Sequence, residues 1–220
     1  MSSGIYNTDA RSEVPEEVKI TTHDAIVEAG GRAIYKQTDV DVAEQVEDAV
    51  QTALEMFGSL GILVNNDGIA HEAHKPTRVH EAVEEIWDKN IRVNTKSVFL
   101  GCKYGIAQML KEKPHPSSDR GWIIDLNSCA SKGAITSPTR PIALDYASDR
   151  IHVNAICPGP MLHDVHVGSS SAVDLLRRKQ PLNGAGDPDD IARTAVVLAS
   201  DDASFVTGVC LPEDGGFTIH

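Results

Sequence analysis

The chain has 220 residues, which suits one α/β domain with a core of its own, and its 41% content of hydrophobic residues predicts a folded globule. Its 32 Asp and Glu residues exceed its 20 Lys and Arg residues and give a formal net charge of −12. This charge argues against nucleic acids and anionic membranes as partners, because both bind basic surfaces.

The sequence shows no pattern typical of a signal peptide, a membrane helix or a CxxC pair. The first ten residues, MSSGIYNTDA, have no apolar signal core, and no run approaches the roughly 18 apolar residues of a membrane helix. The four cysteines lie far apart and form no CxxC pair. We therefore expect a cytoplasmic protein with reduced thiols.

Strand-like and helical patterns alternate along the chain, which predicts an α/β fold with a mostly parallel sheet and helices on both faces. The expected strands, in chain order, are Arg32–Val40, Gly61–Asn65, Trp122–Leu126, Ile151–Cys157 and Val206–Leu211. The expected helices are Val42–Phe57, Ser97–Lys111, Ile135–Ala147, Val173–Arg178 and Asp189–Ala199. No repeat or linker divides the chain, so we expect a single domain over residues 1–220.

Several motifs, in this order, resemble the short-chain dehydrogenase/reductase family. They are Asn65-Asn66-Asp67-Gly68, the Asn94 segment IRVNTKS, the segment Ile151–Gly159 and the tail Val206–Gly216. The resemblance runs from about Ile20 to the C-terminus. It implies a Rossmann-like doubly wound sheet that binds NAD or NADP at the carboxyl ends of its strands and acts on a small alcohol or ketone.

The resemblance implies three cofactor contacts. Asp39 and Val40 would meet the adenine ring, Asn66 and Gly68 would line the cleft, and Pro158 and Gly159 would lie beside the nicotinamide. Two departures weaken the match: Asp67 stands where Ala is usual and would repel a pyrophosphate, and His163 stands where a Thr usually follows. Alternatively, Asp39 caps the next helix, and Asn66 and Gly68 only form a turn.

The N-terminus departs most from the family, whose members begin with a strand, a glycine-rich turn and a helix that hold the pyrophosphate. Here Met1–Ile5 resembles only the tail of that turn, and we expect residues 1–19 to be an irregular remnant, so that the first βαβ unit is largely missing. The missing strand would be central in the sheet. We hypothesise that Arg32–Val40 closes the gap by pairing directly with Gly61–Asn65.

The resemblance also implies catalytic residues: Asn94, Ser128 and Lys132. Family members use Ser, Tyr and Lys, in which the Tyr transfers the hydroxyl proton and the Lys favours its phenolate. Here the strand that ends in Ser128 runs directly into Cys129–Lys132, so the Tyr segment is deleted. Tyr104 and Tyr146 are the conceivable substitutes.

Each of these sites also has an ordinary interpretation. Asn94 fits a buried structural amide as well as a relay residue, and Lys132 fits a solvated surface lysine as well as a ribose ligand. Histidine pairs at 71 and 74 and at 163 and 166 have the spacing of metal ligands but no convincing third ligand, so we expect no metal.

Two classes of function remain open. The chain is either an NAD(P)-dependent oxidoreductase with degraded motifs or an inactive relative that persists as a binding or assembly partner. Helices Ser97–Lys111 and Ile135–Ala147 resemble those through which family members pair, which implies a homo-oligomer or a mixed oligomer with a full-length relative. We expect Pro138 and Pro141 to break the early turns of the second of these helices.

Overall fold

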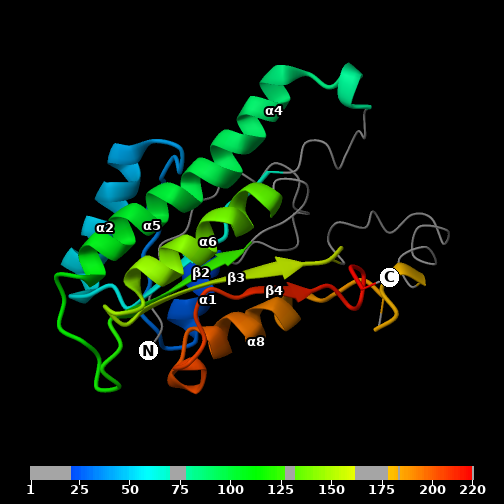
Figure 1. The fold of residues 1–220 in the computed structure, drawn as a ribbon. Helices are drawn as coiled ribbons and strands as arrows, with labels where there is room; N and C mark the ends of the chain where they lie inside the picture. Colours follow the sequence, from blue (N-terminus) through cyan, green and yellow to red (C-terminus); the bar gives the residue numbers. More distant parts are fainter. Residues whose placement is uncertain (1–20, 70–77, 127–131, 162–177, 183, 220) are drawn as a thin grey trace.

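Figure 1 shows the fold of the chain in a computed structural model. The structure describes residues 21–69, 78–126, 132–161, 178–182 and 184–219. The expected helix Val173–Arg178 and the remnant over residues 1–19 fall almost wholly outside these ranges.

A parallel sheet forms the centre of the fold. Its strands are β1 (Ile62–Asn65), β2 (Gly121–Leu126), β3 (Ile151–Pro158) and β4 (Cys210–Glu213), in the spatial order β1-β2-β3-β4. Ile62 pairs with Trp122, Ile124 with Asn154, and Ile156 with Leu211. This confirms the prediction of a parallel α/β sheet, although β4 begins later than the sequence pattern indicated.

Helices cover both faces of the sheet (Figure 1). The helices are α1 (Thr22–Glu28), α2 (Ala43–Phe57), α4 (Glu84–Ile91), α5 (Ser97–Met109), α6 (Lys132–Tyr146) and α8 (Pro188–Leu198). A π-helical segment, η3 (Arg92–Lys96), joins α4 to α5, and short 3-10 turns lie at η2 (Val79–Glu81) and η5 (Asp201–Ala203). The helical patterns therefore predicted α2, α5, α6 and α8, but not α1 or α4.

The sequence predicted the start of α8 from Pro188 and the acidic residues that follow it, and the structure has a helix there. The Asp187 side chain accepts a hydrogen bond from the amide of Asp189, and the Asp190 carboxylate accepts one from the amide of Asp187, which completes a capping box. Pro188 occupies the first turn, where its missing N–H has no cost. Acidic side chains at this end also favour the helix dipole.

The core consists of two apolar layers, one on each face of the sheet. Ile123 of β2 and Val153 of β3 pack with Met109 and Ile106 of α5. The next residue along β2, Ile124, belongs to the opposite layer with residues of β3 and α8. Because successive strand residues face opposite sides, strands buried on both faces must be apolar throughout, as β2 and β3 largely are.

The expected strand Arg32–Val40 is wrong, and so is the hypothesis that it pairs with β1. The structure assigns no strand to these residues, and β1 has a ladder only with β2. The segment is held by α2 instead: Arg32 donates to the carbonyl of Met56, and Lys36 donates to Thr52 and pairs with Asp48. These side-chain contacts hold the segment against α2 without a strand ladder.

The expected break at Pro138 and Pro141 is also wrong, because α6 runs through both prolines. Thr139 and Ala143 on the same helix are buried, and α6 packs against β3. Tertiary packing thus holds the helix together although each proline removes one amide donor.

Replacing Pro141 should stabilise the chain, because this exposed residue lies inside the helix and leaves the carbonyl of residue 137 without its usual donor. We expect Pro141→Ala to raise the free energy of unfolding by about 1–3 kcal/mol in denaturant titrations. Arg140→Ala at the neighbouring exposed position is the control and should change it by less than about 0.5 kcal/mol. A destabilised Pro141→Ala variant would contradict this account of α6.

Candidate functional site

The carboxyl edge of the sheet gathers the segments that the sequence singled out. Since all the strands are parallel, Asn66 and Gly68 after β1 and Pro158 and Gly159 at the end of β3 lie along the same edge. Asn66 and Gly68 are exposed there, while Pro158 and Gly159 are half-buried. The topology therefore places at one edge four of the six residues that the resemblance assigned to cofactor binding, all except Asp39 and Val40.

Asn94 holds the chain that follows β1. Its side chain is buried within η3, its Oδ1 accepts from the Ile69 amide at 2.8 Å, and its Nδ2 donates to the Ile69 carbonyl at 2.8 Å. This pair of bonds uses both ends of the amide and fixes the backbone just after Gly68. The structural interpretation of Asn94 is thus correct, and a relay role stays a prediction.

The turn at Asp39 and Val40 lies close to the Asn94 segment. Lys96 of η3 donates to the Asp41 carbonyl, and the Arg92 guanidinium lies 3.8 Å from the Asp41 carboxylate. Asp39 does not cap α2, whose N-cap is Val42; its carboxylate instead accepts from the Asp41 amide at 3.2 Å. The capping interpretation of Asp39 is therefore wrong in detail, because the carboxylate closes a turn before the helix begins.

Gly159 is required by close packing at the end of β3. A Cβ on this residue would lie 2.7 Å from Cα of Asp214 and 2.5 Å from Nε2 of Gln180. The Gly159 amide donates to the Glu213 carbonyl at 3.0 Å, and Gln180 donates to the carbonyls of Pro160 and Asp214. The turn at Pro158 and Gly159 is thus fixed against the segment after β4, which sequence reasoning treated only as part of a motif.

Asp214 anchors that segment. Burial by itself raises the pKa of its carboxyl group, but hydrogen bonds from the Thr218 hydroxyl and from the amides of Gly216, Thr218 and Phe217 outweigh burial and lower the pKa. Asp214 therefore stays ionised, and its bonds shape the turn that supports Gly159.

The other two predicted catalytic residues are Ser128 and Lys132. Ser128 falls outside the described residues, and Lys132 is the first residue of α6. Tyr146 ends the same helix, about 20 Å along the axis from Lys132, and packs against the core. Tyr104 lies on α5, with the Lys103 ammonium 4.9 Å from its ring centroid. Tyr146 is thus a packing residue and too distant to replace the missing tyrosine.

A buried polar cluster beneath the carboxyl edge was not predicted. Asp125 of β2 is only 1% exposed, and its Oδ1 accepts from the Asn65 side chain at 2.8 Å. The Asn65 amide also lies 3.9 Å from the Cys102 thiol, and a Cβ at Gly101 would overlap Asn65. The available signal was an aspartate within the apolar run WIIDL.

Burial dominates the electrostatics of this cluster. It raises the pKa of Asp125 to about 6, although hydrogen bonds from Asn65 and Thr139 act in the opposite direction. Burial also raises the pKa of the Cys102 thiol, and the nearby Asp125 charge adds to this effect. Cys102 is therefore a protonated, unreactive thiol rather than a nucleophile.

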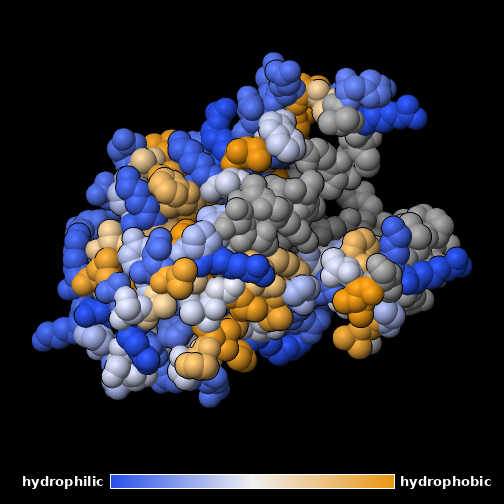
Figure 2. All heavy atoms as spheres, in the orientation of Figure 1, coloured by the Kyte–Doolittle hydropathy of each residue, from blue (hydrophilic) through white to orange (hydrophobic). Residues whose placement is uncertain are grey.

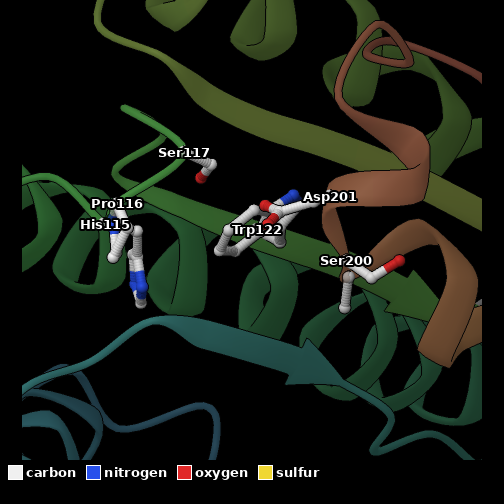
Figure 3. Close-up of a pocket in the computed structure, with 7 residues that line it drawn as sticks. His115, Pro116, Ser117, Trp122, Ser200 and Asp201 are labelled. Carbon is white, nitrogen blue, oxygen red and sulfur yellow. The ribbon is translucent and has the colours of Figure 1, made fainter.

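A separate pocket lies at the amino edge of the sheet (Figure 3). It has a volume of about 330 Å³ and is lined by His115, Pro116, Ser117, Trp122, Ala199, Ser200 and Asp201. Trp122 is the second residue of β2, at the opposite end from Leu126. None of the sequence-predicted site residues contributes to this pocket.

The described residues form neither a metal site nor a membrane-spanning helix. Within the described ranges, no group of three or more His, Cys, Asp or Glu side chains is placed to hold a metal, and both histidine pairs named above lie outside those ranges. No helix in the described part of the chain has the length and apolar character needed to cross a bilayer.

The described residues fit a nicotinamide dinucleotide in part. The Asn94 bonds order the backbone along this edge. The space beside Gly159 is filled by Gln180 and Asp214, so it supports the turn but gives no separate evidence for a ligand. Asp67, in contrast, places an exposed carboxylate after β1, where a phosphate would be repelled. This edge therefore combines an ordered backbone with a charge that opposes a phosphate, and the assignment of cofactor contacts to Pro158 and Gly159 stays a prediction.

Asp125 should make stability depend on pH. Its pKa is about 6 in the folded chain and near 3.8 when unfolded, so the folded state binds the proton more tightly. The free energy of unfolding should therefore fall by about 2 kcal/mol as pH rises from 4 to 7, because the proton that the folded state holds more tightly is lost over this range. Asp125→Asn should remove this component and stabilise the chain at pH 7, as measured by denaturant titrations across that range.

The exposed Asp145 on α6 supplies the matched control for this test. Asp145→Asn should leave the pH profile of stability unchanged. A variant at Asp125 that keeps the wild-type profile would show that another group carries the pH dependence.

Comparisons with known proteins agree with this architecture. Residues 10–218 match the family model described as enoyl-(acyl carrier protein) reductase. Glucose 1-dehydrogenase 2 of Bacillus subtilis is 33% identical over 90% of this chain and 80% of its own length. The 3beta-hydroxysteroid dehydrogenase 1 of Eggerthella lenta is 36% identical over 97% of this chain and 85% of its own length.

Solved structures with a similar fold also come from short-chain dehydrogenases. A structure assigned to the short-chain alcohol dehydrogenases, from Sinorhizobium meliloti 1021, superimposes with a TM-score of 0.79 at 29% identity and covers 90% of this chain and 81% of its own. One assigned to the short-chain dehydrogenases/reductases, from Burkholderia xenovorans, has a TM-score of 0.75 at 26% identity, over 88% and 78%. With its Rossmann-like sheet and these relatives, the chain belongs to the short-chain dehydrogenase/reductase family of NAD(P)-dependent oxidoreductases.

Proposed function

We propose that the chain binds NAD or NADP at the carboxyl edge of its sheet and is an oxidoreductase of a small alcohol or ketone with an incomplete proton relay. The observation that carries this proposal is the double hydrogen bond between Asn94 and Ile69, which orders the backbone after β1 next to η3. Such an arrangement supports the edge as a preformed site.

Different residues of the chain would contact different parts of the cofactor and substrate. Pro158 and Gly159 bound the nicotinamide end, Asn66 and Gly68 line the middle, and Asp39 and Val40 lie toward the adenine end. Lys132, the first residue of α6, orients the ribose, and Ser128, outside the described residues, orients the substrate oxygen. Bound NAD(P)(H) supplies or accepts the hydride.

Proton transfer to or from the substrate is the step for which the chain lacks the usual residue. A tyrosine has a pKa of about 10 that a nearby lysine can lower toward neutrality, whereas a serine hydroxyl is a far weaker acid. The spacing of four residues from Ser128 to Lys132 leaves no tyrosine between strand and helix. This observation favours a second candidate function, in which the chain is an inactive binding or assembly partner.

Cofactor binding can be measured directly by thermal melts of the full chain with NADH or NADPH. A ligand at one hundred times its Kd stabilises the native state by about 2.7 kcal/mol, so a bound cofactor should raise Tm visibly. Asn94→Ala should lower the stability of the free chain and shrink the cofactor-induced shift, because Ile69 loses both of its side-chain partners.

Lys111→Ala, an exposed change after α5, is the control and should keep the full shift. If neither cofactor moves the melt of the wild-type chain, the binding proposal fails.

Turnover separates the two candidate functions. Glucose and a 3β-hydroxysteroid, for which the relatives are named, are the first substrates to test with both cofactors. Ser128→Tyr restores a tyrosine four residues before Lys132, and a positioned proton donor contributes about 10²–10⁴-fold to rate. We expect slow wild-type turnover that this variant raises by about tenfold or more.

Ser128→Phe is the matched control, since it has the same ring without the hydroxyl and should give no gain. A chain that binds cofactor but shows no turnover as wild type or as Ser128→Tyr would support the inactive partner instead.

A further inference from the structure

One edge of the sheet is open. β1 is the last strand in the spatial order and pairs only with β2, and no other strand among the described residues lies beside it. Figure 3 shows β1 running next to β2 with no strand on its outer side. The nearest candidate in the sequence, Arg32–Val40, is tied to α2 through Arg32 and Lys36 and does not form a ladder with β1.

The direction of the backbone groups on this edge follows from one hydrogen bond between β2 and the residue before β1. The Trp122 amide donates to the Gly61 carbonyl at 3.0 Å, so Gly61 turns its backbone toward β2. Because backbone groups alternate in direction along a strand, Leu63 also faces β2, while the N–H and C=O groups of Ile62 and Val64 point away from it.

The side chains of these two residues are also uncovered. Leu63 faces α5, where a Cβ at Gly105 would lie 2.7 Å from its Cδ2. Ile62 and Val64 therefore lie on the other face, and they are 49% and 45% exposed. The edge thus presents two β-branched apolar side chains together with unpaired backbone donors and acceptors.

Nothing in the local sequence protects this edge. Natural edge strands are usually guarded by charges, proline or a bulge. Residues 60–66, LGILVNN, contain neither a charged residue nor a proline, in a chain whose net charge is −12. An unguarded edge of this kind favours the addition of another strand.

We propose that two copies of this chain pair through the free edge of β1 and form one continuous sheet across a twofold axis. The edge is complementary to itself in antiparallel register. With Leu63 opposite Leu63 of the second copy, each Ile62 exchanges its outward N–H and C=O bonds with Val64 of the other copy, and each Val64 with Ile62.

This register also matches the side chains. Ile62 of one copy and Val64 of the other lie directly opposite each other on the same face as a hydrogen-bonded pair, and directly opposed β-branched side chains stabilise antiparallel strands. A twofold contact uses the same patch on both copies, so the assembly closes at two. Since the strip is uncharged but the whole chain is acidic, added salt should strengthen the dimer by screening the repulsion between the copies.

The inference does not depend on cofactor binding and is tested by sedimentation of the full chain over a range of concentrations. The wild type should show a reversible monomer–dimer equilibrium. Val64→Pro removes an outward amide without touching a bond to β2, so it should weaken dimerisation at least tenfold while the circular dichroism spectrum stays unchanged. Val64→Lys, which places a charge on the edge, should act likewise and serves if the proline variant does not fold.

A second apolar surface supplies the control. Apolar side chains gather over α8 (Figure 2), where Val196 is 70% exposed. Val196→Lys should leave the β1 dimer intact. Hydrogen exchange adds a direct readout: the amides of Ile62 and Val64 should become protected as concentration rises, whereas that of Leu63 should be protected throughout.

Three outcomes would overturn the proposal. One is a wild-type chain that stays monomeric across the concentration range, and another is a dimer that both Val64 variants retain. The third is a dimer in which the Ile62 and Val64 amides gain no protection, because that pattern would place the contact on helices instead.

Discussion

The parallel pairing of β2 with β3 is the constraint on which the rest of the structure depends. Ile123, Ile124, Val153 and Ile156 are buried on the two faces of this pair, so helices must cover both sides. α5 and α6 meet one face and α8 the other. The same pairing sets the direction of every other strand, and with it the edge at which functional loops emerge.

Buried polar side chains support the carboxyl edge of the sheet. Asn94 holds Ile69, Gln180 and Asp214 hold the turn around Gly159, and Asn65 contacts the buried carboxyl of Asp125. The raised pKa of Asp125 shows that this polar layer costs free energy at neutral pH. Such costs are common beneath functional edges, where loops have to be held in one conformation.

The two edge strands of the sheet, β1 and β4, differ in what covers them. β4 is followed by a segment that Gly159, Gln180 and Asp214 hold against β3. Among the described residues, no segment covers β1 in this way: Arg32–Val40 is bound to α2, and Ile62 and Val64 are half-exposed. The unequal edges explain how one chain can have a well-packed centre and still present a surface suited to a second copy.

The sequence by itself determined the family, the parallel α/β class and most of the regular elements. Apolar runs such as GILVN at residues 61–65 and the capping pattern at Pro188 act locally, so they can be recognised residue by residue. It also located Asn94 and the turn at Pro158 and Gly159. Only the tertiary structure decided that Arg32–Val40 is not a strand, that α6 continues through Pro138 and Pro141, and that Asp125 is buried. Those outcomes depend on partners distant in the chain, because a strand needs a neighbour, a strained helix needs a packing surface, and a carboxyl group's pKa depends on what surrounds it.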